Sequence, residues 1–393
     1  MRNPLNKVVT DMKPSGIRKF FDIVSEMKDA ISLGVGEPDF ETPWHICEEG
    51  IYSLERGKTH YTSNAGLMEL RQEICNYMKR HYALEYKASE NVLITVGGSE
   101  AIDLAMRVMI EPGEEVIIPQ PSYVSYEPCV LLAGGVSKII NLKNENEFKL
   151  TKEELLEAIT DKTKALILPF PNNPTGAIMT KSELEEIAQV CIEKDIIVVS
   201  DEIYSELTYG EEKHTSIASL PGMWERTIVI NGFSKSHAMT GWRLGYACGP
   251  ELLIKQMLKV HQYAIMCAPT TSQFAAVEAL RDGDKDVERM RNAYDQRRRY
   301  LLEEFRSMGL DCFEAKGAFY VFPCIKSLGM TSDEFAVKLL EEEKVAVVPG
   351  TAFGDCGEGF LRISYAYSID NLKIAMERIR RFVEKRKAEL DGK

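Results

Sequence analysis

The sequence predicts an α/β protein made of a large domain, whose mainly parallel sheet lies between helices, and a smaller α+β domain. Two observations carry this prediction. Between residues 90 and 250, short apolar runs alternate with amphipathic helical stretches, which is typical of a mainly parallel sheet. Beyond residue 285 the pattern changes to one long charged helix followed by short, separated strands, which indicates a second unit.

The expected strands of the large domain are rich in β-branched residues and apolar on both faces, as strands covered by helices on both sides usually are. They are Val92–Val96, Glu115–Ile118, Ala165–Leu168, Ile196–Ser200, Thr227–Ile230 and Tyr246–Cys248. After the first of them a helix is expected to begin at Ser99, and further helices are expected over Leu253–Leu258 and Gln273–Leu280.

A long charged helix from Lys285 to about Met308 opens the smaller unit. Its expected strands are Phe319–Phe322, Val345–Val348 and Leu361–Ser364, and a charged helical pattern starts near Asn371. The first 40 or so residues are irregular because glycine and proline punctuate them. We therefore place a large domain at residues 45–285 and assign residues 1–44, together with 286–393, to an N-terminal arm and the small domain.

Composition excludes several classes of protein. The chain has 393 residues, 45% of them hydrophobic, which is enough for a sizeable core, and its net charge of -12 argues against binding to nucleic acid. Its nine cysteines are scattered, without CxxC pairs or metal-ligand spacing, which favours a reducing, cytoplasmic environment and no metal. No apolar run approaches the roughly 18 residues of a membrane helix, so no membrane association is expected.

Five loops after the expected strands carry polar side chains, and ligands of α/β sheets bind at the carboxyl ends of strands. The loops contain Gly97-Gly98-Ser99-Glu100, Pro121-Ser122-Tyr123, Pro171-Asn172-Asn173-Pro174-Thr175-Gly176, Asp201-Glu202-Ile203-Tyr204, and Ser234-Lys235 followed by Gly241-Trp242-Arg243. In the same order, they would supply an anion-binding helix N-terminus, an aromatic ring for stacking, a side-chain amide, a carboxylate with a phenol, and a lysine with an arginine. Together they would suit a planar, phosphorylated, cationic heterocycle.

Segments along nearly the whole chain match one family in order and spacing. They are Asn231–Tyr246 around Lys235, Asn172–Gly176, Ser200–Tyr204, Gly36–Phe40, Tyr61–Gly66 and Leu361–Ser364. The chain resembles the class I/II, fold-type I aminotransferases, which use pyridoxal 5'-phosphate, and within them the aspartate aminotransferase-like branch. It is similar in particular to bacterial N-acetyl-diaminopimelate aminotransferases. The resemblance implies that the sheet of the large domain has seven strands.

The resemblance also implies three catalytic residues. Lys235 would form the Schiff base with the cofactor and, once freed, move the α-proton of the substrate. Asp201 would pair with the protonated pyridine nitrogen, and Tyr204 would hydrogen-bond the 3'-oxygen of the ring. Asp201 as the N-cap of a following helix, and Tyr204 as simple packing, remain alternatives.

The phosphate of the cofactor would be held at one end of the site. Arg243 and Ser234 would bind it with their side chains, and Gly98, Ser99 and Glu100 would bind it through the start of their helix. A structural ion pair remains an alternative for Arg243, and a plain turn and cap remains one for the glycine-rich segment.

Three further contacts complete the implied cofactor site. Tyr123 would stack on the ring, unless it only packs. Asn173 would hydrogen-bond the 3'-oxygen, unless it is a turn residue before Pro174. Tyr61 would reach the phosphate of a second subunit across a dimer interface.

The substrate would meet Arg362, Gly36 and Asn173. The planar guanidinium of Arg362 would bind the α-carboxylate, and the backbone at Gly36 would approach the substrate closely. Either residue could instead be structural. The contact that recognises the substrate side chain is not visible, and Arg18 is as well explained as a surface charge.

The expected function is therefore a pyridoxal-phosphate-dependent aminotransferase, a cytoplasmic homodimer with a shared active site. It would move an amino group from an L-amino acid, such as N-acetyl-diaminopimelate, aspartate or an aromatic amino acid, to a 2-oxo acid, with 2-oxoglutarate favoured. A β-lyase or a decarboxylase on the same scaffold is the alternative chemistry. A pyridoxal-phosphate-binding regulatory protein is a remote alternative, because such proteins carry an added DNA-binding region and this chain is acidic.

Overall fold

The computed structural model describes residues 4–14 and 29–392, and its centre is a seven-stranded sheet. The strand order is β2-β8-β7-β6-β5-β3-β4, and every strand is parallel to its neighbours except β8, which is antiparallel to both β2 and β7. The strands are β2 (Val92–Thr95), β3 (Glu115–Gln120), β4 (Val136–Asn141), β5 (Thr163–Leu168), β6 (Ile197–Asp201), β7 (Thr227–Gly232) and β8 (Gly245–Cys248). The predicted α/β class and the seven-stranded sheet are confirmed.

Six of these strands coincide with the apolar runs in the sequence, whereas β4 has no such run. β4 lies at the edge of the sheet and pairs only with β3. Its residues are only partly covered, and Val136 is 46% exposed. Its polar residues Ser137, Lys138 and Asn141 leave only short apolar stretches in the strand, so its apolar signal is weak.

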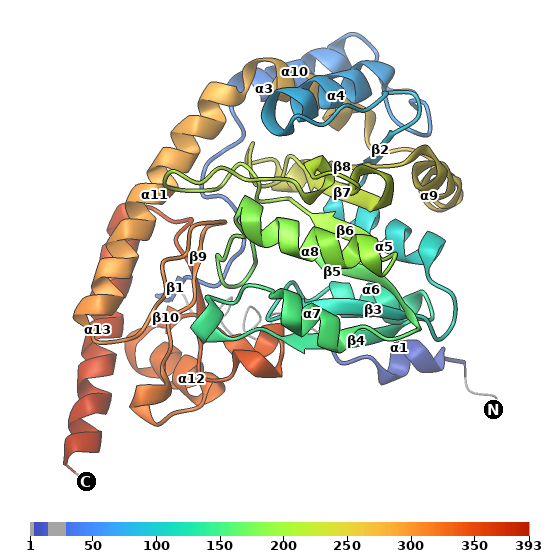
Figure 1. The fold of residues 1–393 in the computed structure, drawn as a ribbon. Helices are drawn as coiled ribbons and strands as arrows, with labels where there is room; N and C mark the ends of the chain where they lie inside the picture. Colours follow the sequence, from blue (N-terminus) through green and yellow to red (C-terminus); the bar gives the residue numbers. More distant parts are fainter. Residues whose placement is uncertain (1–3, 15–28, 393) are drawn as a thin grey trace.

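Helices cover both faces of the sheet (Figure 1). The α-helices are α1 (Lys7–Asp11), α3 (Trp44–Glu55), α4 (Met68–Tyr82), α5 (Gly97–Met109), α6 (Tyr126–Leu132), α7 (Lys152–Ala158), α8 (Lys181–Glu193), α9 (Glu251–Ala264), α10 (Thr270–Asp282), α11 (Asp284–Ser307), α12 (Ser332–Glu343) and α13 (Ile369–Asp391). Threonine capping boxes begin α7, α8 and α12 at Thr151, Thr180 and Thr331. Among the described helices, none is long and apolar enough to cross a membrane.

The two faces of the sheet follow from the period of two along each strand. On β5, Leu166 and Leu168 pack with the helices α7 and α8, whereas Ala165 and Ile167 pack with α5, α6 and α9. Burying each large apolar side chain in this way contributes roughly 1.5–3 kcal/mol. Two apolar faces make the strand a continuous hydrophobic run, which is why the sequence reveals it.

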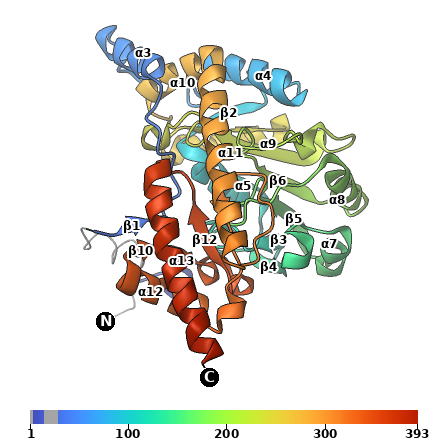
Figure 2. The ribbon, with the colours of Figure 1, turned by 90° about the vertical axis from the view of Figure 1, so that its left-hand side faces the viewer.

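The C-terminal third of the chain packs beside the large sheet. Its strands are β9 (Tyr320–Val321), β10 (Val345–Ala346), β11 (Val348–Pro349) and β12 (Leu361–Ser364), and β1 (Ile31–Ser32) joins them from the N-terminal segment. The strands β11, β12 and β9 form an antiparallel sheet, and β1 pairs in parallel with β10. The helices α11 and α13 run side by side over this unit (Figures 1 and 2).

Two strand predictions for this unit need correction. The run Val345–Val348 is not one strand, because Val345–Ala346 pairs with β1 and Val348–Pro349 pairs with β12. Within Phe319–Phe322, only Tyr320–Val321 pairs as strand. In both runs burial extends beyond the paired residues, so hydrophobicity overstates the strand length.

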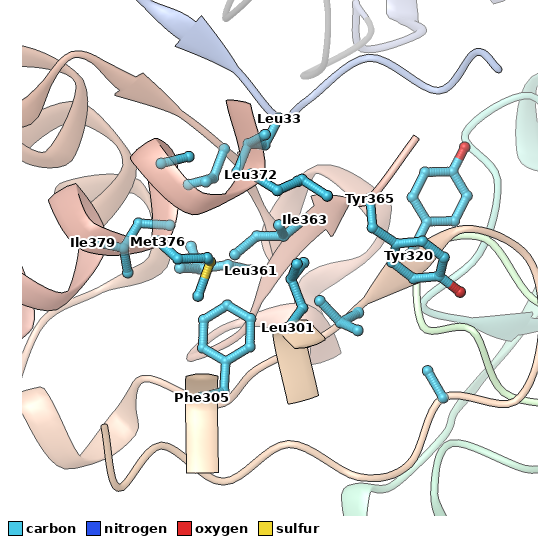
Figure 3. Close-up of a cluster of buried hydrophobic side chains, with 14 of the residues drawn as sticks. Leu33, Leu301, Phe305, Tyr320, Leu361, Ile363, Tyr365, Leu372, Met376 and Ile379 are labelled. Carbon is cyan, nitrogen blue, oxygen red and sulfur yellow. The ribbon is translucent and has the colours of Figure 1, made fainter. Parts of the chain in front are cut away.

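The core of this unit joins residues that are far apart in sequence. Leu301 and Phe305 on α11 meet Ile363 on β12 and Met376 on α13, as Figure 3 shows. Leu33, next to β1, is fully buried in the same cluster. The N-terminal segment is therefore anchored beside β10 and β12, directly before Gly34 and Gly36.

Candidate active site

The principal pocket of the described chain is a cavity of about 520 Å³ at the carboxyl ends of the central strands. Asp201 ends β6, Lys235 follows β7, and Asn173 follows β5. All predicted site residues except Glu100 and Tyr61 line it, namely Gly36, Gly98, Ser99, Tyr123, Asn173, Asp201, Tyr204, Ser234, Lys235, Arg243 and Arg362. This is the edge where the parallel topology brings loops from distant parts of the chain together.

Lys235 has an altered acidity. Its pKa is lowered to about 8, first by burial, and the positive charges of Arg362 and Arg243 act in the same direction, whereas Glu37 opposes them. Its Nζ donates a hydrogen bond to the carbonyl oxygen of Gly36 at 2.6 Å. A lysine with a pKa near 8 exists partly as the neutral amine at physiological pH, and the neutral amine is the form that attacks carbonyls and accepts protons.

Asp201 is buried at the floor of the pocket, with 7% of its surface exposed. Burial raises the pKa of its carboxyl group, and a hydrogen bond from the Tyr126 hydroxyl to Oδ2, at 2.7 Å, opposes that rise. The backbone N–H of Ile203 donates to Oδ1 at 3.2 Å. No helix follows among residues 202–210, so the alternative role as a helix N-cap is wrong.

Tyr126 was missed in the sequence although it lines the pocket and binds Asp201. It begins α6, three residues after Tyr123, and the two rings meet edge to face at 5.6 Å. A second tyrosine in a loop after a strand was the available signal.

Tyr204 and Tyr320 form a buried pair on the wall of the pocket. Their hydroxyl oxygens lie 2.8 Å apart, and the Tyr204 side chain is 5% exposed. Tyr320 was also missed, and its signal was a hydroxyl within the apolar strand that holds Phe319 and Val321. The pair presents phenolic oxygens to the pocket, so Tyr204 does more than pack.

Arg362 is a buried cation without a carboxylate partner among residues 4–14 and 29–392. It is 3% exposed and lies between the rings of Tyr320 and Phe353, 4.7 Å from each centroid. It donates from Nη1 to Oδ1 of Asn173 at 3.0 Å and from Nη2 to the carbonyl oxygen of Gly34, whereas Nε has no partner. A buried charge without an opposite charge is costly, so this guanidinium suits an anionic ligand.

A second anion-binding set lies at the start of α5. Gly97, Gly98 and Ser99 line the pocket together with Ser234 and Arg243. Arg243 donates to the carbonyl oxygen of Thr240 at 3.2 Å and forms no ion pair within the described chain, so a structural ion pair is not supported. Gly97 has a φ of +75°, and a Cβ there would lie 3.0 Å from Nη2 of Arg243, so glycine permits this close approach.

Glu100 and Tyr61 lie outside the pocket. The Glu100 carboxylate is turned away from it and binds the backbone N–H of Val96 and the ring of His261. Tyr61 is 79% exposed on the single subunit. Of the N-terminal arm considered for side-chain recognition, Arg18 lies outside the described residues.

Comparison with known proteins assigns the family. The family model described as aminotransferase class I and II matches residues 28–379. The chain belongs to this family. An aspartate aminotransferase of Pyrococcus abyssi is 48% identical over 96% of this chain and 97% of its own length. A Bacillus subtilis protein named as a probable N-acetyl-LL-diaminopimelate aminotransferase is 45% identical over 98% of each chain.

Solved structures agree with this assignment. The aspartate aminotransferase of Thermus thermophilus, solved with maleate, is 40% identical to this chain and matches it with a TM-score of 0.92. The match covers 97% of this chain and 100% of the Thermus chain. The protein is therefore a transaminase of the class I and II family, and its cofactor is pyridoxal 5'-phosphate.

The residues of this aminotransferase fit that cofactor. A lysine of lowered pKa faces a buried carboxylate across the pocket, and an arginine without a counter-charge stands beside a helix start. Such a set accommodates an aldehyde, a ring nitrogen that takes up a proton, and a phosphate. Arg362, with its unpartnered Nε, then remains for the carboxylate of a substrate.

Proposed function

We propose that this aminotransferase moves the amino group of an L-amino acid to a 2-oxo acid, with 2-oxoglutarate favoured, in two half-reactions at one site. The observation that carries the proposal is Lys235, whose pKa is lowered to about 8 in a pocket that is also lined by Asp201, Arg243 and Arg362. The Thermus relative was solved with maleate, a dicarboxylate, which supports a dicarboxylic acceptor. The donor is N-acetyl-diaminopimelate, aspartate or an aromatic amino acid.

Lys235 is the proposed base. Pyridoxal phosphate, when bound, supplies an electron sink for the bond that breaks at the substrate α-carbon. The neutral Nζ of Lys235 takes the proton from that carbon and returns it to the other end of the reacting system. Its hydrogen bond to the Gly36 carbonyl oxygen, at 2.6 Å, holds the amine beside the backbone that is proposed to approach the substrate.

Asp201 is the proposed partner of the pyridine nitrogen. Its carboxylate stays ionised against the cost of burial through the donors at Tyr126 and Ile203, and through a protonated ring nitrogen when the cofactor is bound. Tyr204 and Asn173 present a hydroxyl and an amide for the 3'-oxygen, and Tyr123 lines the pocket where a ring would stack.

Arg243 and Arg362 are proposed to bind two different anionic groups, the cofactor phosphate and the substrate carboxylate. Arg243 is proposed to bind the phosphate with Ser234 and the N–H groups of Gly98 and Ser99. Arg362 is proposed to bind the substrate α-carboxylate, with Asn173 and the backbone at Gly36 beside it.

We also propose that the enzyme is a cytoplasmic homodimer that acts in amino-acid metabolism. Each subunit would have a large domain at residues 45–285, and a small domain with an N-terminal arm at residues 286–393 and 1–44. All nine cysteines are free thiols, which fits a reducing compartment. Tyr61, Trp44 and Tyr263 are between 68% and 85% exposed, and large apolar exposure of this kind marks interfaces. Tyr61 would reach the phosphate of the second subunit, and sedimentation equilibrium should give twice the mass of 44.4 kDa.

A half-reaction assay tests the proposed chemistry. Mixing the holoenzyme with one equivalent of a good donor, without acceptor, should convert the cofactor to its amino form, seen by absorbance, and release one equivalent of 2-oxo acid. Adding 2-oxoglutarate should restore the starting spectrum. A panel of aspartate, acetylated diaminopimelate and aromatic amino acids ranks the donors. Release of ammonia or carbon dioxide without spectral conversion would instead show a lyase or decarboxylase.

Replacing Tyr126 with phenylalanine is expected to lower kcat about tenfold or less, because one hydrogen bond to a buried charge is lost. Since that bond lowers the pKa of Asp201, its loss raises the pKa, and the carboxylate becomes protonated at a higher pH. The acidic limb of the kcat/KM profile should therefore move to higher pH. Tyr300→Phe, on α11 and outside the pocket, is the control. An unmoved limb with an unchanged kcat would contradict this role.

A further inference from the structure

The carboxylate of Glu100 occupies an unusual place for a residue in the first turn of α5. The start of this helix lines the pocket through Gly97, Gly98 and Ser99, whereas Glu100, the next residue, does not line it. Its Oε2 accepts the Val96 backbone N–H at 2.5 Å, and its Oε1 lies 2.7 Å from Nδ1 of His261.

His261 is held in place to make this contact. It is fully buried, with 0% exposure, on the face of α9 that also buries Ile254 and Met257, and α9 packs against α5. Nδ1 carries the hydrogen of the pair, because only a donor there satisfies the carboxylate. Nε2 is buried and has no hydrogen-bond partner among the described residues, so the polar contact of the His261 ring is the one from Nδ1 to Glu100.

The turn before α5 has little room to adjust from the other side. A Cβ added at Gly245 would lie 2.7 Å from the backbone of Gly97 and Gly98, and one added at Gly97 would meet the Arg243 guanidinium. The backbone of this turn thus lies close to β8 and Arg243, and it also donates a hydrogen bond to the Glu100 carboxylate. The Glu100 carboxylate binds this turn at the N–H of Val96, the residue directly before α5.

Charge gives the pair a second effect. A carboxylate in the first helical turn is attracted to the same partial positive charge that attracts a phosphate, so the two anions compete for one helix end. With the His261 donor present, the Glu100 carboxylate is held by two groups, the His261 ring and the Val96 N–H. Without His261, among the described residues only the Val96 N–H holds it, and the carboxylate can move toward the N–H groups at Gly98 and Ser99.

We propose that His261 is a positioning residue for cofactor binding, which acts by holding the Glu100 carboxylate away from the phosphate end of the pocket. The inference rests on the proposed location of the phosphate at the start of α5. It makes Glu100 a residue that acts through its charge, and assigns no direct phosphate contact to its side chain.

The test compares pyridoxal phosphate with pyridoxal, which lacks the phosphate, in titrations of the full-length apoenzyme followed by absorbance. His261→Leu should weaken pyridoxal phosphate about tenfold, a change of about 1.4 kcal/mol, and leave pyridoxal within about threefold of the wild type. His261→Asn, whose amide nitrogen lies near the position of Nδ1, should restore most of the affinity. The double variant His261→Leu/Glu100→Gln should also recover it, because the freed side chain no longer carries a charge.

One control and one substitute variant separate this effect from general destabilisation. His45 also lies between two carboxylates, those of Glu278 and Asp286, but away from the pocket, so His45→Leu should not change the ratio of the two affinities. If His261→Leu does not fold, His261→Met, of similar volume and without a donor, replaces it in both the single and the double variant.

The outcomes of these binding titrations separate the role of His261 from the proposed function. Equal weakening of pyridoxal and pyridoxal phosphate, or no recovery in the double variant, overturns the role of His261. Failure of the wild-type chain to bind either compound would instead overturn the proposed function.

Discussion

Replacing Lys235 with alanine is expected to lower kcat by at least about 10⁴-fold, because the variant loses both the amine that attacks the cofactor and the base that moves the α-proton. Its pKa, lowered to about 8, is what makes Lys235 competent for both tasks near neutral pH. No other lysine lines the pocket, among the residues that the structure describes, to take its place.

The loss should be chemical rather than structural. The side chain makes one hydrogen bond, to the carbonyl oxygen of Gly36, so the melting temperature should change little. Pyridoxal phosphate should still bind through Arg243 and the start of α5, with the absorbance of the free aldehyde. Lys255→Ala, at an exposed position on α9, should keep full activity. Turnover above 1% of the wild type in the absence of added amines would refute the assignment.

Replacing Arg362 with leucine should reduce kcat/KM on the order of 10³-fold for amino acids and 2-oxo acids alike. Removing one partner of a buried, hydrogen-bonded charge pair costs about 2–5 kcal/mol, and the substrate carboxylate would be that partner. Arg362→Lys should recover only part of the loss, since an ammonium keeps the charge but lacks the planar fork. The affinity for pyridoxal phosphate should not change, because the phosphate is assigned to Arg243.

Arg298 provides a matched control for Arg362. It is also 3% exposed, but it pairs with Asp295 at 2.7 Å and Glu314 at 3.2 Å. Arg298→Leu should lower the melting temperature, because Asp295 then keeps, among the described residues, only the ion pair with the exposed Arg299, and should leave KM unchanged.

Arg362→Leu should lower the melting temperature of the substrate-free enzyme less than Arg298→Leu does, since it leaves two neutral acceptors, at Asn173 and Gly34, without a donor but strands no carboxylate of the described chain. Two results would show that Arg362 is structural. One is a larger fall in melting temperature for Arg362→Leu than for Arg298→Leu, and the other is a loss of kcat/KM for amines without a carboxylate that equals the loss for amino acids.

The sequence predicts the large sheet well where strands are buried on both faces. β5 and β7 are continuous apolar runs because helices cover both of their sides. β4 is not predicted because it is an edge strand that contains several polar residues. β10 and β11 are predicted as one strand because hydrophobicity does not show that the two halves of the run pair with different strands.

The site divides in a similar way. Lys235, Asp201 and Arg243 are found from their position after strands within a spaced set of motifs, and the structure brings them to one cavity. Tyr126 and Tyr320 are not found, because a tyrosine next to a helix start or inside an apolar strand is usually only packing. Their roles depend on the atoms that they meet, Oδ2 of Asp201 and the hydroxyl of Tyr204.

By itself, the sequence determined the α/β class, the order of the strands along the chain and the identity of most residues around the pocket, and its resemblance to a family implied the cofactor. Those properties depend on local patterns, in which apolar periodicity and polar residues after strands are visible without a fold. Only the tertiary structure decided that Glu100 turns away from the pocket toward His261 and that Arg362 is buried without a counter-charge. Both results come from contacts between segments more than 150 residues apart, and a side chain's direction and charge environment exist only after those segments have packed together.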